Sequence, residues 1–227
     1  MKIALCLLTW DEIKGCRHDV PLLDRSQFDE IYAVDGGSTD GTVEYLAEQG
    51  IPVYAQPRAG LNAAHIHAFE KCSADALVIF HPKGSVPVEE TLRFRSYFEQ
   101  GYDLVIASRN IAGARNEEDR RLFKPRKWFV FFLALCAAAL FRREGPVIWD
   151  VLHGFRGVSV KAFRAVAPAG HGTAIDLELV SRGYKQRLRM AEFPVKEQPR
   201  LAGKSHFKAL STGAKLLKYL FQEALGG

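Results

Sequence analysis

The sequence has few cysteines, and their spacing excludes a structural zinc site. Only four occur among 227 residues, and no two are spaced like a pair of zinc ligands: Cys6, Cys16, Cys72 and Cys136. Cys6 and Cys136 lie in apolar runs, which is typical of buried thiols rather than of metal ligands. This sparse usage indicates a reducing compartment, so we expect a cytoplasmic protein.

The chain also lacks an apolar run as long as a membrane span. Residues 128–141, WFVFFLALCAAALF, are clearly shorter than the roughly 20 apolar residues that a span requires. Basic residues flank this run on both sides: Arg126, Lys127, Arg142 and Arg143. The segment is therefore a buried core helix, a helix that pairs with a second copy in a homodimer, or a helix lying on an anionic membrane surface. The N-terminal apolar run is short and has no small-residue cleavage site, so we interpret it as a buried strand rather than a signal peptide.

Repeats, low-complexity segments and nucleic-acid recognition motifs are absent too. Their absence argues against extensive disorder and against nucleic acid as a partner. The chain does have a basic excess, with a formal net charge of +5 that gathers after residue 115 and again in the last thirty residues. This charge favours anionic partners, such as phosphates, nucleotides or an acidic membrane surface.

Short apolar runs alternate with amphipathic stretches along the chain. We predict strands at 2–8, 31–35, 51–55, 76–80, 103–107, 154–160 and 186–195, and helices at 42–50, 60–72, 128–141, 174–183 and from about residue 206. This order predicts an α/β fold with a Rossmann-like, mostly parallel central sheet flanked by helices, in one domain over 1–227. Ligands of such sheets bind at the carboxyl ends of the strands.

Two further segments carry expectations of their own. The polar segment 108–126 is long for a structureless loop, so we expect a lid or a disordered stretch. The final helix gathers Leu210, Leu217, Leu220, Phe221 and Leu225 on one side, and we expect it to pack on the domain, with a membrane as the alternative.

The stretch 34–42, VDGGSTDGT, follows a predicted strand and opens a predicted helix. Its glycines permit tight turns, and Ser38, Thr39 and Asp40 can cap the helix. Helix capping does not require Asp35. Its carboxylate, at the strand end, can instead accept a hydrogen bond from a base N–H or a ribose hydroxyl.

Several stretches occur in one order: TWDE (9–12), VDGGSTDGT (34–42), ALVIF (76–80), ASRN (107–110), HGFRGVSV (153–160) and IDLELVSRGYKQRLRMAEFPV (175–195). Together they resemble family 2 glycosyltransferases of the GT-A fold, and especially the polyprenyl-phosphate sugar transferases similar to dolichyl-phosphate mannose synthase. The resemblance covers nearly the whole chain, and VDGGSTDGT is its most specific part. It implies inverting sugar transfer from a UDP- or GDP-sugar to a polyprenyl phosphate at the inner face of a membrane. Residues 1–107 would form the nucleotide-sugar half and 108–227 the acceptor half.

The resemblance also implies a role for each matching residue. The donor-binding residues are Thr9, Trp10, Glu12, Asp35, Gly37, Arg58, His81, Ser108 and Arg109. The catalytic residues are Asp150, His153 and Arg156, together with Lys83, whose role rests on its charge and not on the resemblance. The residues for the acceptor phosphate are Arg126, Arg200, Lys204, Ser205 and His206.

One departure from the family concerns the metal. The family ends its fourth strand with Asp-any-Asp, which holds Mg²⁺ or Mn²⁺ against the diphosphate, whereas this chain has His81-Pro82-Lys83. A protonated lysine cannot ligate a cation, and a lone histidine is a poor ligand for a hard ion. Lys83, helped by Arg58 or Arg109, could instead neutralise the leaving diphosphate directly. We therefore expect metal-independent transfer and assign no metal ligand; the alternatives are a non-catalytic nucleotide- or sugar-binding regulatory protein on a degenerate fold, and an unusual divalent-cation site.

The acceptor decides whether a general base is needed. A lipid phosphate is already anionic, so cations that position it suffice. A saccharide hydroxyl would need a base, for which Asp150, His153 and His81 are candidates, with Asp176 and Glu178 less favoured. A buried ion pair is the plainer interpretation of Asp150 and Arg156. Nucleotidyl transfer to sugar phosphates is a third activity, but no glycine-rich phosphate-binding signature near the N-terminus supports it.

Overall fold

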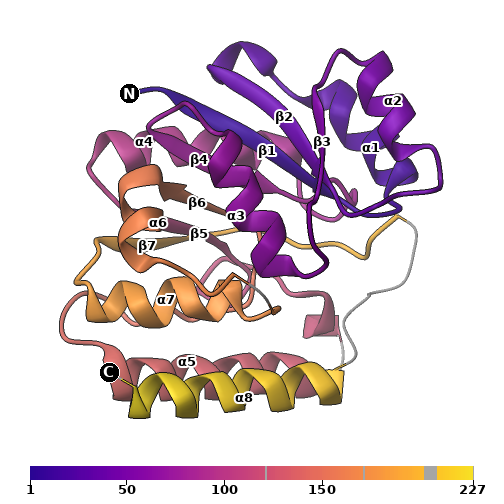
Figure 1. Cartoon of the computed structure of the whole chain (residues 1–227). Helices are drawn as coiled ribbons and strands as arrows, with labels where there is room; N and C mark the ends of the chain where they lie inside the picture. Colours follow the sequence, from indigo (N-terminus) through magenta and orange to yellow (C-terminus); the bar gives the residue numbers. More distant parts are fainter. Residues whose placement is uncertain (121, 171, 202–208, 227) are drawn as a thin grey trace.

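A computed structural model describes residues 1–120, 122–170, 172–201 and 209–226. Within these residues the chain forms one seven-stranded sheet in the order β3-β2-β1-β4-β6-β5-β7 (Figure 1). The strands are β1 (Ile3–Thr9), β2 (Glu30–Asp35), β3 (Val53–Ala55), β4 (Ala76–Phe80), β5 (Leu104–Ser108), β6 (Arg156–Ser159) and β7 (Met190–Pro194). Only β6 runs antiparallel to its neighbours, so the predicted α/β class with a mostly parallel sheet is confirmed.

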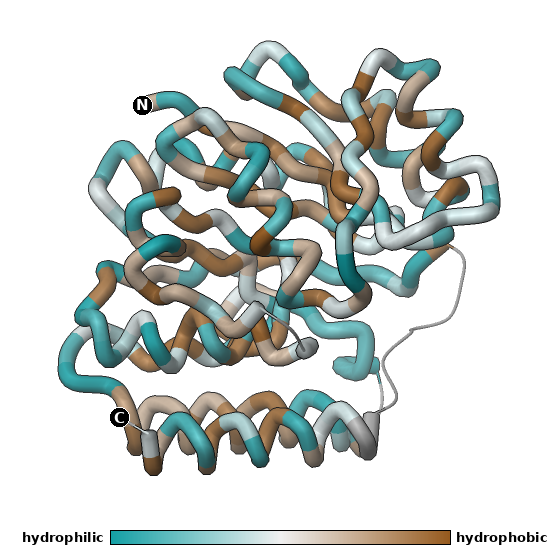
Figure 2. Tube along the Cα trace, viewed as in Figure 1, coloured by the Kyte–Doolittle hydropathy of each residue, from teal (hydrophilic) through white to brown (hydrophobic). Residues whose placement is uncertain are grey.

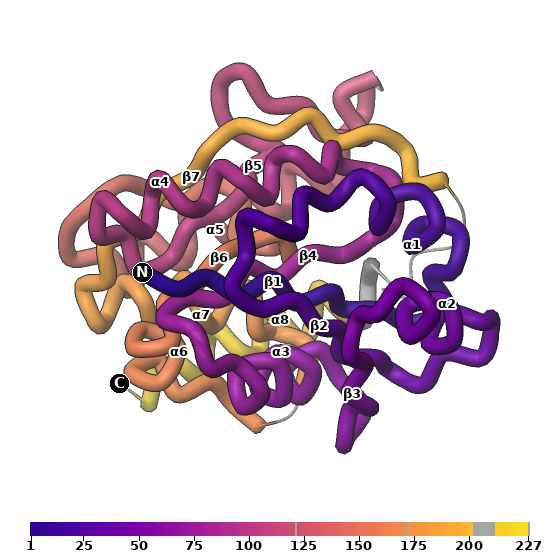
Figure 3. The backbone as a smooth tube through the Cα atoms, turned by 90° about the horizontal axis from the view of Figure 1, so that it is seen from above, coloured from indigo at the N-terminus to yellow at the C-terminus, as the bar shows by residue number. Residues whose placement is uncertain are grey.

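Helices cover both faces of the sheet (Figure 3). They are α1 (Ile13–Asp19), α2 (Thr42–Glu48), α3 (Leu61–Lys71), α4 (Arg93–Glu99), α5 (Pro125–Phe141), α6 (Val160–Val166), α7 (Ile175–Lys185) and α8 (Ala209–Leu225). Short 3₁₀ turns occur at η1 (Val20–Leu22), η2 (Arg25–Gln27), η3 (Val88–Leu92) and η4 (Glu117–Arg120). None of the helices in the described ranges combines the length and the apolar character that a membrane crossing needs.

Alternating side chains of the central strands feed two separate cores. In β4, Leu77 and Ile79 join the core beneath α3, α5, α6, α7 and α8, whereas Val78 and Phe80 join the core beneath α1, α2 and α4. Successive strand residues point to opposite faces, and because both faces are covered by helices the strands read as unbroken apolar runs. The cores leave the carboxyl ends of β1, β4 and β5 free to carry polar loops.

The described part of segment 108–126 is ordered, so the alternative of a disordered stretch is wrong: η4 forms within it, and Arg115 forms an isolated parallel β-bridge with Lys196. The alternative of a lid stays a prediction. The buried Glu118 accepts hydrogen bonds from the backbone N–H groups of Arg126 and Lys127, at 3.1 Å each. A carboxylate in this position satisfies unpaired donors at the start of α5 and interacts favourably with the helix dipole.

The last two helices form an outer layer. α8 packs against α5, and α5 packs against α7, so the pair lies on the side of α7 away from the sheet (Figure 1). α8 buries Leu216 and Leu220, which agrees with packing on the domain, but it leaves Leu217, Phe221 and Leu225 exposed. The predicted grouping of Leu217 with Leu220 on one side is therefore wrong, and the side chain of Leu210 lies outside what the structure describes.

Candidate active site

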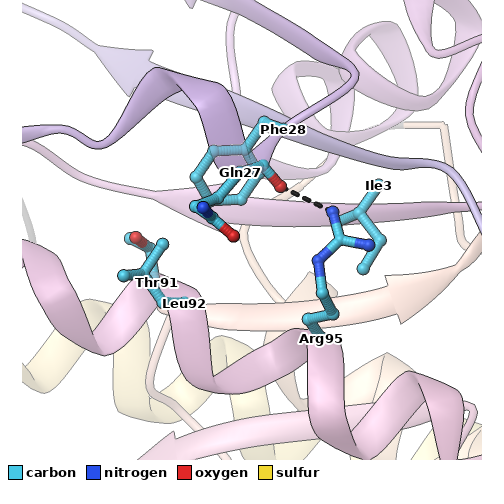
Figure 4. Close-up of a pocket in the computed structure, with 6 residues that line it drawn as sticks. All are labelled: Ile3, Gln27, Phe28, Thr91, Leu92 and Arg95. Carbon is cyan, nitrogen blue, oxygen red and sulfur yellow. Dashed lines mark hydrogen bonds between the residues drawn. The ribbon is translucent and has the colours of Figure 1, made fainter.

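A cavity of about 740 Å³ opens at the carboxyl ends of the strands. Its described lining comes from the end of β4, the loop after β5, the start of α5, residues 152–155, the start of α7, residues 197–200, and α8. Among the residues predicted for the site, the lining includes His81, Lys83, Arg109, Arg126, His153 and Arg200. A second cavity, at the amino end of β1, is lined by Ile3, Gln27, Phe28, Thr91, Leu92 and Arg95, and its volume of about 10 Å³ is too small for a substrate (Figure 4).

The turn that carries Lys83 is held from two directions. On one side, the buried Asp19 of α1 accepts a hydrogen bond from the Gly84 N–H at 2.8 Å. α1 also approaches at Gly15, where an added Cβ would lie 2.0 Å from the Pro82 carbonyl oxygen. On the other side, the Leu201 N–H donates to the Lys83 carbonyl at 3.2 Å. The backbone position of Lys83 is therefore fixed before any ligand binds.

The Lys83 ammonium is a cation without a fixed partner. Across the described residues, no hydrogen bond or ion pair engages it. Burial lowers the pKa of Lys83, and the neighbouring Glu12 carboxylate opposes that shift, whereas Arg200 adds to it. A partly desolvated ammonium that lines a cavity and lacks a carboxylate partner is suited to bind an anion.

Arg109 is already neutralised by acidic side chains. Its guanidinium donates to both oxygens of Asp150, at 2.8 and 2.9 Å, and to Glu197 at 3.3 Å. Burial alone would raise the pKa of Asp150, but the Arg109 charge outweighs it and lowers the pKa to about 2. Because its charge is compensated by these carboxylates, Arg109 is less able to bind an anionic ligand than the sequence suggested. Asp150 is not suited to act as a general base, because its carboxylate faces Arg109.

Arg156 is fully buried and is not part of the described cavity lining. It donates to the carbonyl oxygens of His153 and Asp176, and its Nε lies 3.1 Å from Asp176 Oδ1. The predicted ion pair between Asp150 and Arg156 is wrong in its partners, because Asp150 pairs with Arg109 and Arg156 pairs with Asp176. Arg156 therefore holds the backbone of His153 and the start of α7.

Two imidazoles line the cavity in their neutral form. Burial, reinforced by Arg109, lowers the pKa of His153 to about 3, and its Nδ1 contacts the carbonyl oxygen of Ala107. Burial, reinforced by Lys83, also lowers the pKa of His81 well below its usual range. A general base works best when its pKa lies near the working pH. Both histidines are thus weak bases at neutral pH but remain able to hydrogen-bond a sugar.

Asp176 and Glu178 behave differently from each other. Glu178 is buried and accepts from Asn62 Nδ2 and from the Ala169 N–H, so it is committed to the fold. Asp176 lines the cavity, and its Oδ1 has no hydrogen-bond partner among the described residues, because the nearby Nε–H of Arg156 points at a carbonyl instead. A carboxylate that the sequence ranked low therefore lines the cavity with an oxygen that accepts no hydrogen bond from the described residues, as does Glu197.

Asp35, which was predicted to contact the nucleoside, is not among the described residues that line this cavity. Asp35 accepts hydrogen bonds from the Thr9 and Ser38 hydroxyls, at 2.7 and 2.6 Å, and from the N–H groups of Gly37 and Ser38. A carboxylate has about four acceptor positions, and these contacts fill them. In this conformation Asp35 orders the turn before α2, where Gly37 adopts a φ of 95°. Its contact with a nucleoside stays a prediction.

The remaining predicted residues are divided between paired and peripheral positions. Arg200 lies 3.7 Å from Glu12, and Arg126 donates to Glu117 at 3.1 Å. Ser108 is buried, whereas Trp10 and Arg58 are exposed, and none of the three is among the described lining residues. Lys204, Ser205 and His206, the rest of the predicted acceptor clamp, lie outside the described residues.

The residues at the end of β4 do not fit a divalent-cation site of the usual kind. Within 1–120, 122–170, 172–201 and 209–226, no three His, Cys, Asp or Glu side chains are placed to hold one ion. The cation at this position belongs to Lys83, and a protonated ammonium repels a metal.

Sequence reasoning missed two groups of residues. The first is Glu197, whose Oε2 is buried without a hydrogen-bond partner among the described residues. It follows the last strand, and this strand-end position could have indicated a site residue. The α1 contacts from Gly15 and Asp19 carried no such signal, since they depend on how α1 packs against the turn after β4.

The mostly parallel sheet with a cavity at its strand ends has the GT-A fold. Solved structures of glucosyl-3-phosphoglycerate synthase from Mycobacterium tuberculosis share this fold. The complex with Mn²⁺, UDP-glucose and phosphoglyceric acid matches with a TM-score of 0.73 and 18% identity, over 98% of this chain and 79% of that one. The complex with Mg²⁺ and UDP matches with a TM-score of 0.71 and 16% identity, over 99% and 79%.

The chain belongs to glycosyl transferase family 2, whose family model matches residues 10–167. Glycosyltransferase AglJ of Haloferax volcanii is 24% identical over 208 residues. The match covers 88% of this chain but 65% of AglJ, so this chain spans less than two thirds of that relative.

Proposed function

We propose that this chain transfers a sugar from a UDP- or GDP-sugar to a polyprenyl phosphate, with inversion, and that the Lys83 ammonium replaces the divalent cation. The observation that carries this proposal is an unpaired ammonium in a cavity where neighbouring cations are already paired with acids. Binding of UDP-glucose by the M. tuberculosis enzyme supports the choice of donor. We place the reaction at the cytoplasmic face of a membrane.

The proposed chemistry is a single displacement. A phosphate oxygen of the acceptor attacks the anomeric carbon, the bond from that carbon to the diphosphate oxygen breaks, and its electron pair leaves with the nucleoside diphosphate. Lys83 stabilises the charge that develops on the leaving group. No proton has to be removed, which suits a cavity whose histidines are weak bases and whose Asp150 faces Arg109.

The acceptor side of the cavity is lined by both charged and apolar side chains. Arg126 and Lys127 line it at the start of α5, beside Phe129 and Val130 from the same helix. Leu216 of α8 adds a further apolar surface. A phosphate attached to an isoprenoid chain has both of these chemical characters, which favours it over a free saccharide.

The test measures product. The purified chain, given UDP- or GDP-sugars and a short polyprenyl phosphate in detergent, should release the nucleoside diphosphate. Lys83→Ala should lose this release, and Lys161→Ala, which changes an exposed lysine on α6, should keep it. Nucleotide binding without release would support the non-catalytic alternative, and pyrophosphate release would indicate nucleotidyl transfer.

A saccharide hydroxyl acceptor is the second candidate, and Asp176 favours it. Asp176 lines the cavity, and its buried Oδ1, which lies 3.1 Å from Arg156 Nε, accepts no hydrogen bond from the described residues. Glu197 Oε2 is the other such carboxylate oxygen of a lining residue, but Glu197 is paired with Arg109 through its Oε1. Under this alternative, Asp176→Asn abolishes transfer to a sugar acceptor. Under the lipid-phosphate proposal, the same variant keeps most of the transfer to polyprenyl phosphate.

A further inference from the structure

The outer layer formed by α5 and α8 exposes large apolar side chains to solvent. They are between 42% and 73% exposed: Trp128, Phe132, Leu135, Leu140, Leu217, Phe221 and Leu225. We call this set the α5–α8 face. Figure 2 shows the hydrophobic segments of both helices along the edge of the molecule farthest from the sheet. A contiguous apolar surface of this kind marks an interaction site in a folded protein.

The exposed residues follow the period of each helix. On α5, Trp128, Phe132 and Leu135 are spaced i, i+4, i+7, and on α8, Leu217, Phe221 and Leu225 are spaced i, i+4, i+8. Residues at these intervals form one stripe along a helix. The buried side chains of the same helices already pack in the core, so packing within the chain does not require the exposed stripes.

The charge around the α5–α8 face is mostly positive. Arg142 and Arg143 follow the end of α5, and Lys215 and Lys218 lie on α8; all four are exposed. The acidic Glu223 of α8 does not offset these charges, because it pairs with Arg182 and Lys185. The exposed Glu144 follows the two arginines and offsets only one of the four positive charges.

This charge distinguishes between two occupants. A symmetric pair of chains meeting through the α5–α8 face would bring two sets of like charges to one interface, which is unfavourable. An anionic bilayer instead supplies apolar volume for the aromatic and leucine side chains and negative charge for the rim.

The α5–α8 face is continuous with the candidate active site. The same two helices line the cavity with different side chains, Phe129 and Val130 from α5 and Gly213 and Leu216 from α8. At the crossing the helices approach closely, since a Cβ added to Gly213 would lie 3.3 Å from the Phe129 ring. A surface that rests on these helices therefore lies beside the acceptor end of the cavity.

We propose that the α5–α8 face docks onto an anionic bilayer and inserts its apolar side chains into the interfacial layer. The proposal deepens the proposed function, on which its biological meaning rests, because docking would bring a lipid-linked phosphate to the cavity without extracting it from the membrane. The docking itself is a property of the surface and can be measured without turnover.

The experiment compares vesicle binding by three chains. Leu135→Gln combined with Phe221→Gln removes two exposed apolar side chains that do not line the cavity, and glutamine keeps the helix propensity. The matched control is Leu22→Gln, a 60% exposed leucine in η1. Wild type and control should co-sediment with vesicles that contain phosphatidylglycerol and bind pure phosphatidylcholine at least tenfold less well. The double variant should bind the anionic vesicles at least tenfold less well, with an unchanged melting temperature.

Three results would overturn the docking proposal. One is equal vesicle binding by the double variant and the control. Another is binding that does not depend on anionic lipid. The third is a wild-type dimer in light scattering that the double variant dissociates, which would assign the face to a second copy of the chain. Failure of the proposed function looks different: the double variant would bind vesicles poorly, as expected, yet no chain would release nucleoside diphosphate with a detergent-solubilised acceptor.

Discussion

Replacing Lys83 by methionine should stabilise the fold and weaken donor binding at the same time. The ammonium is partly desolvated and has no ion-pair partner among the described residues, so its charge destabilises the ligand-free protein. Removing such a functional-site charge is expected to raise the free energy of unfolding by about 1 kcal/mol. In a chain of this size that corresponds to roughly 2–4 °C in melting temperature.

The loss in affinity follows from the bond that Lys83 would make. A hydrogen bond to a charged group contributes about 1.5–3 kcal/mol, so Kd for UDP should rise by roughly 10- to 150-fold. Because the pKa of Lys83 is lowered, its destabilising charge is present below that pKa and disappears as the pH rises through it. The stability advantage of Lys83→Met should therefore shrink at alkaline pH.

Calorimetric titration with UDP in EDTA and thermal unfolding at several pH values measure both effects. Lys161→Met, at an exposed position on α6, is the control and should change neither. Unchanged UDP affinity in Lys83→Met would mean that another group neutralises the diphosphate. A lower melting temperature would mean that the ammonium is engaged in the free protein, contrary to the structure.

Three further predictions concern the supports of the site. Gly15→Ala should lower UDP affinity at least tenfold while the chain still folds, because its Cβ would displace the Pro82 carbonyl and with it the Lys83 turn. Calorimetric titration of the folded variant with UDP measures this effect. An unchanged affinity would contradict the proposal that α1 positions Lys83. Asp150→Ala should cost about 3–5 kcal/mol of stability, since it leaves the Arg109 guanidinium with a buried charge that is no longer fully compensated, and urea unfolding tests it. The pKa of Asp150 is lowered from 3.8 to about 2, so its contribution is complete above pH 4 and is lost as the pH falls toward 2. Asp150→Asn should therefore show a shallower loss of stability over that interval than wild type, and parallel acid curves would contradict the pairing.

The strands could be predicted because their apolar runs are short, unbroken and separated by turns. Two of the seven-residue helices, α4 and α6, were harder to predict. α4 has only Phe94 and Phe98 to bury, and α6 begins inside a predicted strand at Val160, where Ser159 accepts a hydrogen bond from the Ala162 N–H and starts the helix. The serine is a local helix-start signal, but the valines on both sides of it favour a strand, so the sequence predicted a strand there.

The candidate site was predictable in its residue types but not in its pairings. Family resemblance indicated Arg109, and the charge of Lys83 at a strand end, where the chain departs from the family, indicated Lys83; both line the cavity. The partners of Arg109 lie 41 and 88 residues away along the chain, so only the tertiary structure reveals that this arginine is neutralised. The same limit hid the free oxygen of Asp176, because it depends on where Arg156 directs its N–H groups.

The most direct test of a lysine in place of a metal is turnover in a chelator. With a UDP- or GDP-sugar that serves as donor and a polyprenyl phosphate as acceptor, release of nucleoside diphosphate should continue at an undiminished rate in excess EDTA, and added Mg²⁺ or Mn²⁺ should not increase it. Complete loss of release in EDTA, restored by either ion, would contradict the assignment of Lys83 as the cation that stabilises the leaving group.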